Sequence, residues 1–207
     1  MSPIITHEDE KLLASLDVDI AKQFKSLSKN IKKIKKRERK LGEEYQDYTK
    51  ELKAYVRIMK DKEKQLEILA REKSSGVSQE EIDEYKKRIQ DETDKIKMIE
   101  GYYDRLKDLA LAKETIISTM REYSDLLKDN SDIREEIVDL GLDIEKAKNK
   151  MVAAGKISEI EDEIKDVERE FERSKKELDK KWSQLEDERA EVNGLWHALK
   201  DSIGDFE

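Results

Sequence analysis

The sequence predicts an all-α protein built as an elongated, antiparallel coiled coil of three long helices. The first observation is composition: the 207 residues include one proline, seven glycines and no cysteine, and 45% are charged against 36% hydrophobic. Such a mixture is typical of long helices when apolar residues recur at helical spacing. The second observation is that three stretches have this spacing. It argues against disorder, which is the alternative for so charged a chain.

The first helix is predicted over residues 8–73, where no proline and a single glycine, Gly42, occur. Thirteen of fifteen positions taken alternately every three and four residues are apolar or aromatic. The fifteen are Ile20, Phe24, Leu27, Ile31, Ile34, Glu38, Leu41, Tyr45, Tyr48, Leu52, Tyr55, Met59, Lys62, Leu66 and Leu69. This unbroken register predicts a coiled-coil seam.

The second helix is predicted over residues 78–154, after a turn at Ser74–Val77. Ser78 and Glu81 have the spacing of a capping box, in which each residue bonds the backbone N–H of the other. The apolar stripe widens between Ile99 and Leu127, which indicates neighbours on two sides. The run Asp129-Asn130-Ser131 predicts a kink near 129–132.

The third helix is predicted over residues 157–204, because Gly155 resembles a helix stop and Ser158 with Glu161 resembles a second capping box. Short turns between long helices place neighbours antiparallel. We therefore expect residues 1–207 to form one helical domain.

A dense basic strip lies on the first helix. Lys22–Lys40 holds ten Lys or Arg and one acid, Glu38, in a chain of net charge −8. With the seam above as reference, eight of the ten lie on the outward face: Lys22, Lys25, Lys29, Lys32, Lys33, Lys36, Arg39 and Lys40. Anionic lipid attracts such side chains, so the strip is a candidate membrane-binding face. Alternatively, it is a solvated face that pairs with acids of the third helix, such as Glu159, Glu161, Asp162, Glu163 and Asp166.

A second group of lysines flanks the predicted turn Met151–Ala154 between the second and third helices. The topology places the basic strip toward this turn, so Lys148, Lys150 and Lys156 are further candidates for contact with lipid. Alternatively, they are cations suited to the negative end of a helix dipole. Nucleic acid is the less favoured polyanion, because the basic face has no interleaved aromatic residues for stacking and the tyrosines are seam residues.

The sequence predicts no enzyme, cofactor, metal site or small-molecule substrate. His7 and His197 are the only histidines, and neither a phosphate-binding glycine loop nor metal-ligand spacing is present. No apolar run approaches the ~20 residues of a membrane span, and residues 1–20 do not resemble a signal peptide. We therefore expect a cytoplasmic protein whose contact with membranes is peripheral.

Two stretches resemble the sorting-nexin type of BAR domain, and the similarity in pattern and size covers nearly the whole chain. They are KRERKLGEEYQDYTKEL in the first helix and MVAAGKISEIEDEIKDVEREFERS at Met151–Ser174. The resemblance implies an antiparallel, crescent-shaped homodimer, or a heterodimer with a related chain. Its basic concave face and tips would bind anionic, curved membrane, often endosomal, and would sense or stabilise tubules.

The resemblance also implies roles for particular residues. The strip and Lys148, Lys150 and Lys156 would contact lipid. The dimer interface would include Tyr102, Tyr103, Leu106, Leu109, Trp196 and Leu199. The expected function is thus a non-enzymatic, dimeric scaffold for curved membranes. The alternative is a structural coiled-coil or spectrin-like adaptor that binds other proteins.

Overall fold

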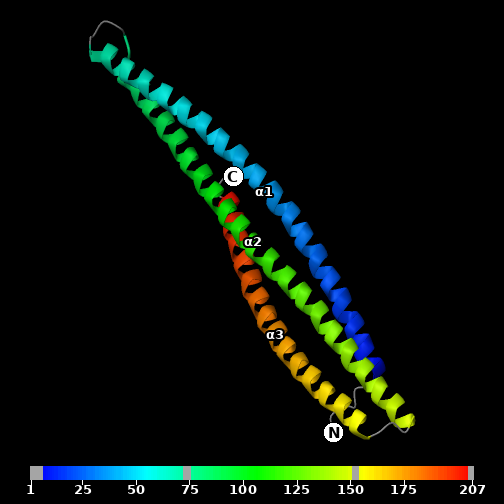
Figure 1. Cartoon of the computed structure of the whole chain (residues 1–207). Helices are drawn as coiled ribbons and strands as arrows, with labels where there is room; N and C mark the ends of the chain where they lie inside the picture. The colour runs from blue at the N-terminus through cyan, green and yellow to red at the C-terminus, as the bar shows by residue number, and fades with distance from the viewer. Residues whose placement is uncertain (1–6, 72–75, 151–153, 205–207) are drawn as a thin grey trace. The chain divides into compact units, whose positions relative to one another are not determined.

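The computed structural model describes residues 7–71, 76–150 and 154–204, and its secondary structure is entirely helical (Figure 1). The helices are α1 (His7–Arg71), α2 (Gln79–Asn149) and α3 (Ala154–Gly204). The prediction of an all-α fold is confirmed. The chain divides into two compact units: unit 1 is Met1–Lys33 with Lys113–Glu191, and unit 2 is Ile34–Ala112 with Val192–Glu207.

The start of α2 has the predicted capping box. The backbone N–H of Glu81 donates to the Ser78 hydroxyl (3.2 Å), and the backbone N–H of Ser78 donates to the Glu81 carboxylate (3.0 Å). Gly76 precedes it with φ 64°, in the left-handed region that a glycine enters without steric cost. Sequence alone therefore located this helix start correctly.

As predicted, the second helix continues through residues 129–132, where Asn130 and Ser131 are buried and bond α1. The kink near these residues stays a prediction. The helix limits around the next turn differ from the expectation. The second helix ends at Asn149, and α3 already begins at Ala154, so Gly155 and Ser158 are helical. A glycine inside a helix costs only about 1 kcal/mol, which the rest of a long helix outweighs.

Unit 1 is built from segments of all three helices. Its apolar core contains the buried Ala21, Leu127 and Leu178, surrounded by Phe24, Tyr123 and Leu126. The ring of Phe24 lies edge-on to Tyr123 and to Trp182, with centroids 5.0 and 6.2 Å apart. Hydrogen bonds from Ser124 to Ala21 and from Ser131 to Ala14 show that α1 and α2 run antiparallel here.

Unit 2 contains two apolar clusters. One joins α1 to α2 through Val56, Met59, Ile89 and Ile96. The other brings Leu199 of α3 against Leu106 and Leu109 of α2, with Tyr45 and Tyr102 packed beside them. Unit 2 is thus an α1–α2 hairpin that α3 joins only with its last residues.

The structure corrects the seam of α1. Phe24, Ile31, Tyr45 and Leu52 face inward as predicted, but the other half of the seam is exposed. The exposed members include Ile20, Leu27, Ile34, Leu41, Tyr48 and Tyr55, with exposed fractions of 39–52%. The next residue along the chain is buried instead, at Ala21, Ser28, Gly42, Thr49 and Val56. These small residues allow close approach: a Cβ at Gly42 would lie 3.2 Å from the Tyr103 ring.

Candidate functional site

All eight strip residues that were predicted to bind membrane are exposed on α1. Unit 1 carries Lys22, Lys25, Lys29, Lys32 and Lys33, and unit 2 carries Lys36, Arg39 and Lys40. On α1, the buried positions on either side of Lys25 are Ala21 and Ser28. Lys25 therefore lies at the edge of the packed face rather than opposite it. The cations therefore cover a broader arc of α1 than the predicted register implied.

Most of these cations have no counter-ion among the residues that the structure describes. Lys22 pairs with Asp19 (3.0 Å), and Arg39 pairs with Glu43 (3.4 Å). Among the described residues, the other six have no ion-pair partner: Lys25, Lys29, Lys32, Lys33, Lys36 and Lys40. In α3, Asp162 and Asp166 instead pair with Lys165 and Arg169 of their own helix. These pairs therefore do not support the alternative that acids of α3 neutralise the basic strip in unit 1.

A groove of about 290 Å³ separates α1 from α2 beside this strip. It is lined by Lys25, Ser28 and Lys29 of α1 and by Arg121, Ser124 and Asp125 of α2. The Ser28 hydroxyl donates to the carbonyl of Lys25, and the Ser124 hydroxyl donates to the carbonyl of Ala21, each at 2.9 Å. Sequence reasoning missed Arg121, because a heptad pattern does not reveal which residue of α2 lies opposite Lys25.

The second lysine group is separate from the strip. Lys148, Lys150 and Lys156 are exposed at the end of α2 and the start of α3, and residues 151–153 of the intervening turn lie outside the described residues. Tyr123, which contacts Phe24, precedes Lys148 by 25 residues of α2, or about 37 Å at 1.5 Å per residue. The expectation that the strip lies near this turn is therefore wrong.

Most of the predicted dimer residues pack within the chain itself. Leu106, Leu109 and Leu199 are buried in one cluster of unit 2, with Tyr102 against them. Burial, together with the nearby Tyr45 and Glu38, raises the pKa of the Tyr102 hydroxyl. Tyr103 is half-buried, and Trp196 is 48% exposed. Of the six, Trp196 has the most surface available, and the dimer role of the set stays a prediction.

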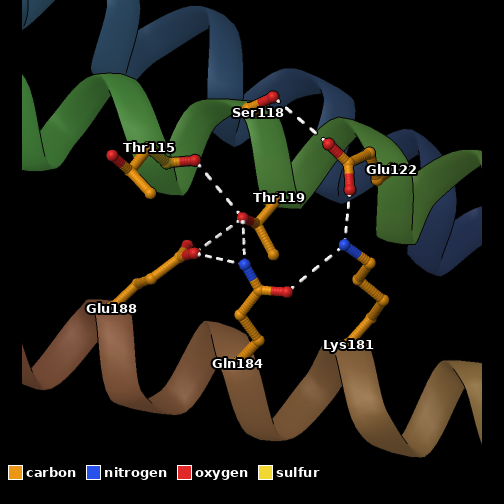
Figure 2. A network of polar contacts seen from close by, with 7 residues as sticks. All are labelled: Thr115, Ser118, Thr119, Glu122, Lys181, Gln184 and Glu188. Carbon is orange, nitrogen blue, oxygen red and sulfur yellow. Dashed lines mark hydrogen bonds and ion pairs between the residues drawn. The ribbon is translucent and has the colours of Figure 1, made fainter.

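A polar network aligns α2 with α3 in unit 1 (Figure 2). The Thr119 hydroxyl donates to the buried Glu188 carboxylate (2.8 Å), and the Gln184 amide donates to the same oxygen (2.8 Å). Lys181 donates to Glu122, and this bond holds the pKa of the Glu122 carboxyl below its usual range. The network fixes the pairing of these helices.

Among the residues that the structure describes, no group of three or more His, Cys, Asp or Glu side chains is placed to hold a metal ion. None of the described helices is both long and apolar enough to cross a membrane.

Comparison with models of known families, with characterised proteins and with solved structures finds no match to this chain. The family resemblance therefore stays an expectation from sequence pattern.

Proposed function

We propose that this protein is a non-enzymatic scaffold that binds anionic membranes peripherally through the basic face of α1. It binds them from the cytoplasmic side, and endosomal membranes are among its targets. In this proposal it acts as a crescent-shaped dimer that senses or stabilises curvature, as the resemblance to BAR domains implies. The observation that carries the proposal is the set of six exposed α1 cations without an ion-pair partner among the described residues.

The charges are numerous enough for reversible attachment. Each Lys or Arg near an anionic surface contributes about 1 kcal/mol, and the contribution decreases within a Debye length of about 8 Å at physiological ionic strength. Six such residues on one helix support peripheral binding that weakens as salt is added. Because their ammonium groups hold no counter-ion within the described parts of the chain, they lose none of the described ion pairs when lipid binds.

Dimer formation has separate support. In unit 2, α1 exposes Ile34, Leu41, Tyr48 and Tyr55 at one heptad position. A repeated apolar position along a helix is the surface that a further helix covers in a bundle. Both a second copy and a related chain fit this surface. A Leu41→Arg variant is expected to shift the sedimentation coefficient of a dimer toward that of the monomer.

Vesicle co-sedimentation tests membrane binding. The wild-type chain is expected to pellet with phosphatidylserine vesicles at low salt. Charge reversal to Glu at Lys29, Lys32, Lys33 and Lys36 should abolish pelleting and leave the circular dichroism spectrum unchanged. The matched control reverses four exposed lysines of α3: Lys175, Lys176, Lys180 and Lys200. Equal loss in both variants would show that net charge, not the α1 face, governs binding.

The second candidate function is a structural coiled-coil or spectrin-like adaptor for other proteins. The exposed apolar positions of α1 favour it as well, because they fit a partner helix of any origin. This alternative predicts no dependence on lipid. Absence of wild-type pelleting on acidic vesicles at low salt, together with a monomeric sedimentation profile, would favour it.

A further inference from the structure

The groove between α1 and α2 in unit 1 concentrates positive charge from two helices. Lys25 and Lys29 approach it from α1, and Arg121 approaches it from α2. The single acid at its rim, Asp125, lies 3.7 Å from Lys128, which offsets part of its charge. The groove lining therefore carries three cations and one acid, a net charge of +2.

The close packing of the two helices forms the groove. Ala21, Ser28 and Ser124 are almost fully buried, and their small side chains let the backbones approach. Both serine hydroxyl protons are already donated to backbone carbonyls. The free hydrogen-bond donors that line the groove are thus the ammonium and guanidinium groups.

These three cations have no counter-ion in the part of the chain that the structure describes. A guanidinium presents a planar fork of N–H donors that matches two oxygens of a phosphate, whereas an ammonium acts as a compact point charge. A phosphate monoester carries a charge of about −1.5 to −2 at neutral pH and three strong acceptor oxygens. A diester, as in phosphatidylserine, offers a single charge and two free oxygens. The charge and donor set of the groove fit the monoester better.

We propose that this groove binds a phosphate monoester through Arg121, Lys25 and Lys29, as found in phosphorylated inositol headgroups or in free inositol phosphates. The inference deepens the proposed membrane function, because it names the headgroup chemistry that α1 and α2 bind together. Binding of this phosphate as part of a lipid rests on that proposed function. The strip attracts anionic lipid without selecting a headgroup. The groove adds a specific contact that only a phosphate monoester satisfies.

Calorimetric titration with soluble inositol trisphosphate tests the groove without a membrane. The Arg121→Gln variant is expected to bind at least about tenfold more weakly than wild type, since a charge-assisted hydrogen bond is lost. Arg105→Gln makes the same substitution at an exposed position of α2 in unit 2 and should leave binding within twofold. Absence of wild-type binding at millimolar ligand, or equal loss in both variants, would overturn the proposal.

A second pair of variants separates the groove from the rest of the strip. Lys25→Gln/Lys29→Gln removes two groove lysines, and Lys32→Gln/Lys33→Gln removes the same charge from the same helix outside the groove. Only the first pair is expected to weaken binding of the soluble probe strongly. Equal weakening by the two pairs would indicate a diffuse charge effect and contradict the groove.

Vesicles distinguish a lipid source from a free compound and separate the two proposals. At matched surface charge, wild type should prefer vesicles with phosphatidylinositol 4-phosphate over phosphatidylserine vesicles, and Arg121→Gln should lose only this preference. If wild type binds the soluble probe through Arg121 but pellets with neither vesicle, the groove stands for a free phosphate compound and the membrane function fails. If it pellets with both equally and Arg121→Gln changes nothing, the groove proposal fails while the membrane function stands.

Discussion

Unit 1 and unit 2 both have apolar cores, but they use their buried polar side chains differently. In unit 1, buried hydroxyls bond across helices: Ser124 reaches the carbonyl of Ala21, Ser131 reaches that of Ala14, and Thr119 reaches Glu188. In unit 2, the buried polar residues Thr49 and Ser202 bond carbonyls of their own helices. Apolar clusters join the helices of unit 2.

The difference affects how specifically the helices of each unit pair with one another. A buried hydroxyl or carboxylate that has lost its partner costs about 1–3 kcal/mol, so the polar contacts of unit 1 disfavour other registers. Apolar contacts are non-directional and accept several partners. Apolar side chains of α1 are half-exposed in both units, at Leu16 and Leu27 in unit 1 and at Leu41 and Tyr48 in unit 2, so exposure by itself does not distinguish the units.

Truncation of the unit 2 core should have the largest effect. Leu109 is fully buried, so Leu109→Ala is expected to lower the free energy of unfolding by about 2–5 kcal/mol through lost burial and a cavity. Urea denaturation measures the change. The control Ile58→Ala, at a residue 66% exposed on α1, should stay within about 0.5 kcal/mol of wild type. Similar costs at both positions would mean that apolar packing does not hold unit 2.

Loss of the ionic contact in unit 1 should rank second. Arg134 pairs with Glu10 (2.6 Å) and Asp17 (3.3 Å) and lies over the Phe171 ring. Arg134→Met leaves two partly buried carboxylates without their cation, for an expected cost of about 2–3 kcal/mol. Arg105→Met, at an exposed position, is the matched control for the same denaturation measurement. No loss at Arg134 would show that this ionic contact does not help to fix α1 against α2 in unit 1.

Removal of a single buried hydroxyl group should cost more stability in unit 1 than in unit 2. Ser124→Ala removes a bond between helices, with an expected cost of about 1 kcal/mol. Ser202→Ala removes a bond within one helix of unit 2 and should cost less, because no contact between helices is lost. Thermal unfolding of both variants compares them. A larger cost at Ser202 would contradict the distinction between the two units.

The exposed ion pair of unit 2 should have the smallest effect. The Lys86 hydrogen bond holds the pKa of the Glu67 carboxyl below its ordinary value, and Glu67 raises the pKa of Lys86. A lowered carboxyl pKa stabilises the fold above the unfolded-state value, and this contribution disappears as pH falls through the folded-state value. Lys86→Met should move the Glu67 pKa back up in an NMR titration. The control Lys87→Met should not, and an unmoved Glu67 pKa in the Lys86 variant would contradict the contact.

Some features were predictable because they depend on residues close in sequence. The capping box of Ser78 and Glu81 spans three residues, and the exposure of the α1 lysines follows from their charge. The opposing Arg121 was not predictable, since its place beside Lys25 depends on how two helices distant in sequence align. The roles of Leu106 and Leu109 were equally hidden, because an apolar stripe does not distinguish a partner in the same chain from a partner in another.

The sequence by itself determined three long helices, their approximate limits and the concentration of cations on α1. Only the tertiary structure decided which edge of α1 faces inward. Two neighbouring registers of α1 both repeat every seven residues. A reading by hydrophobicity chooses the register with the large side chains of Leu27 and Ile34 over the one with the small side chains of Ala21 and Ser28. The small side chains of Ala21 and Ser28 let the backbone of α2 come close to that of α1. At this distance the hydroxyl of Ser124, more than a hundred residues away, donates to the carbonyl of Ala21. That close approach leaves the large apolar side chains exposed and brings Arg121 beside the lysines.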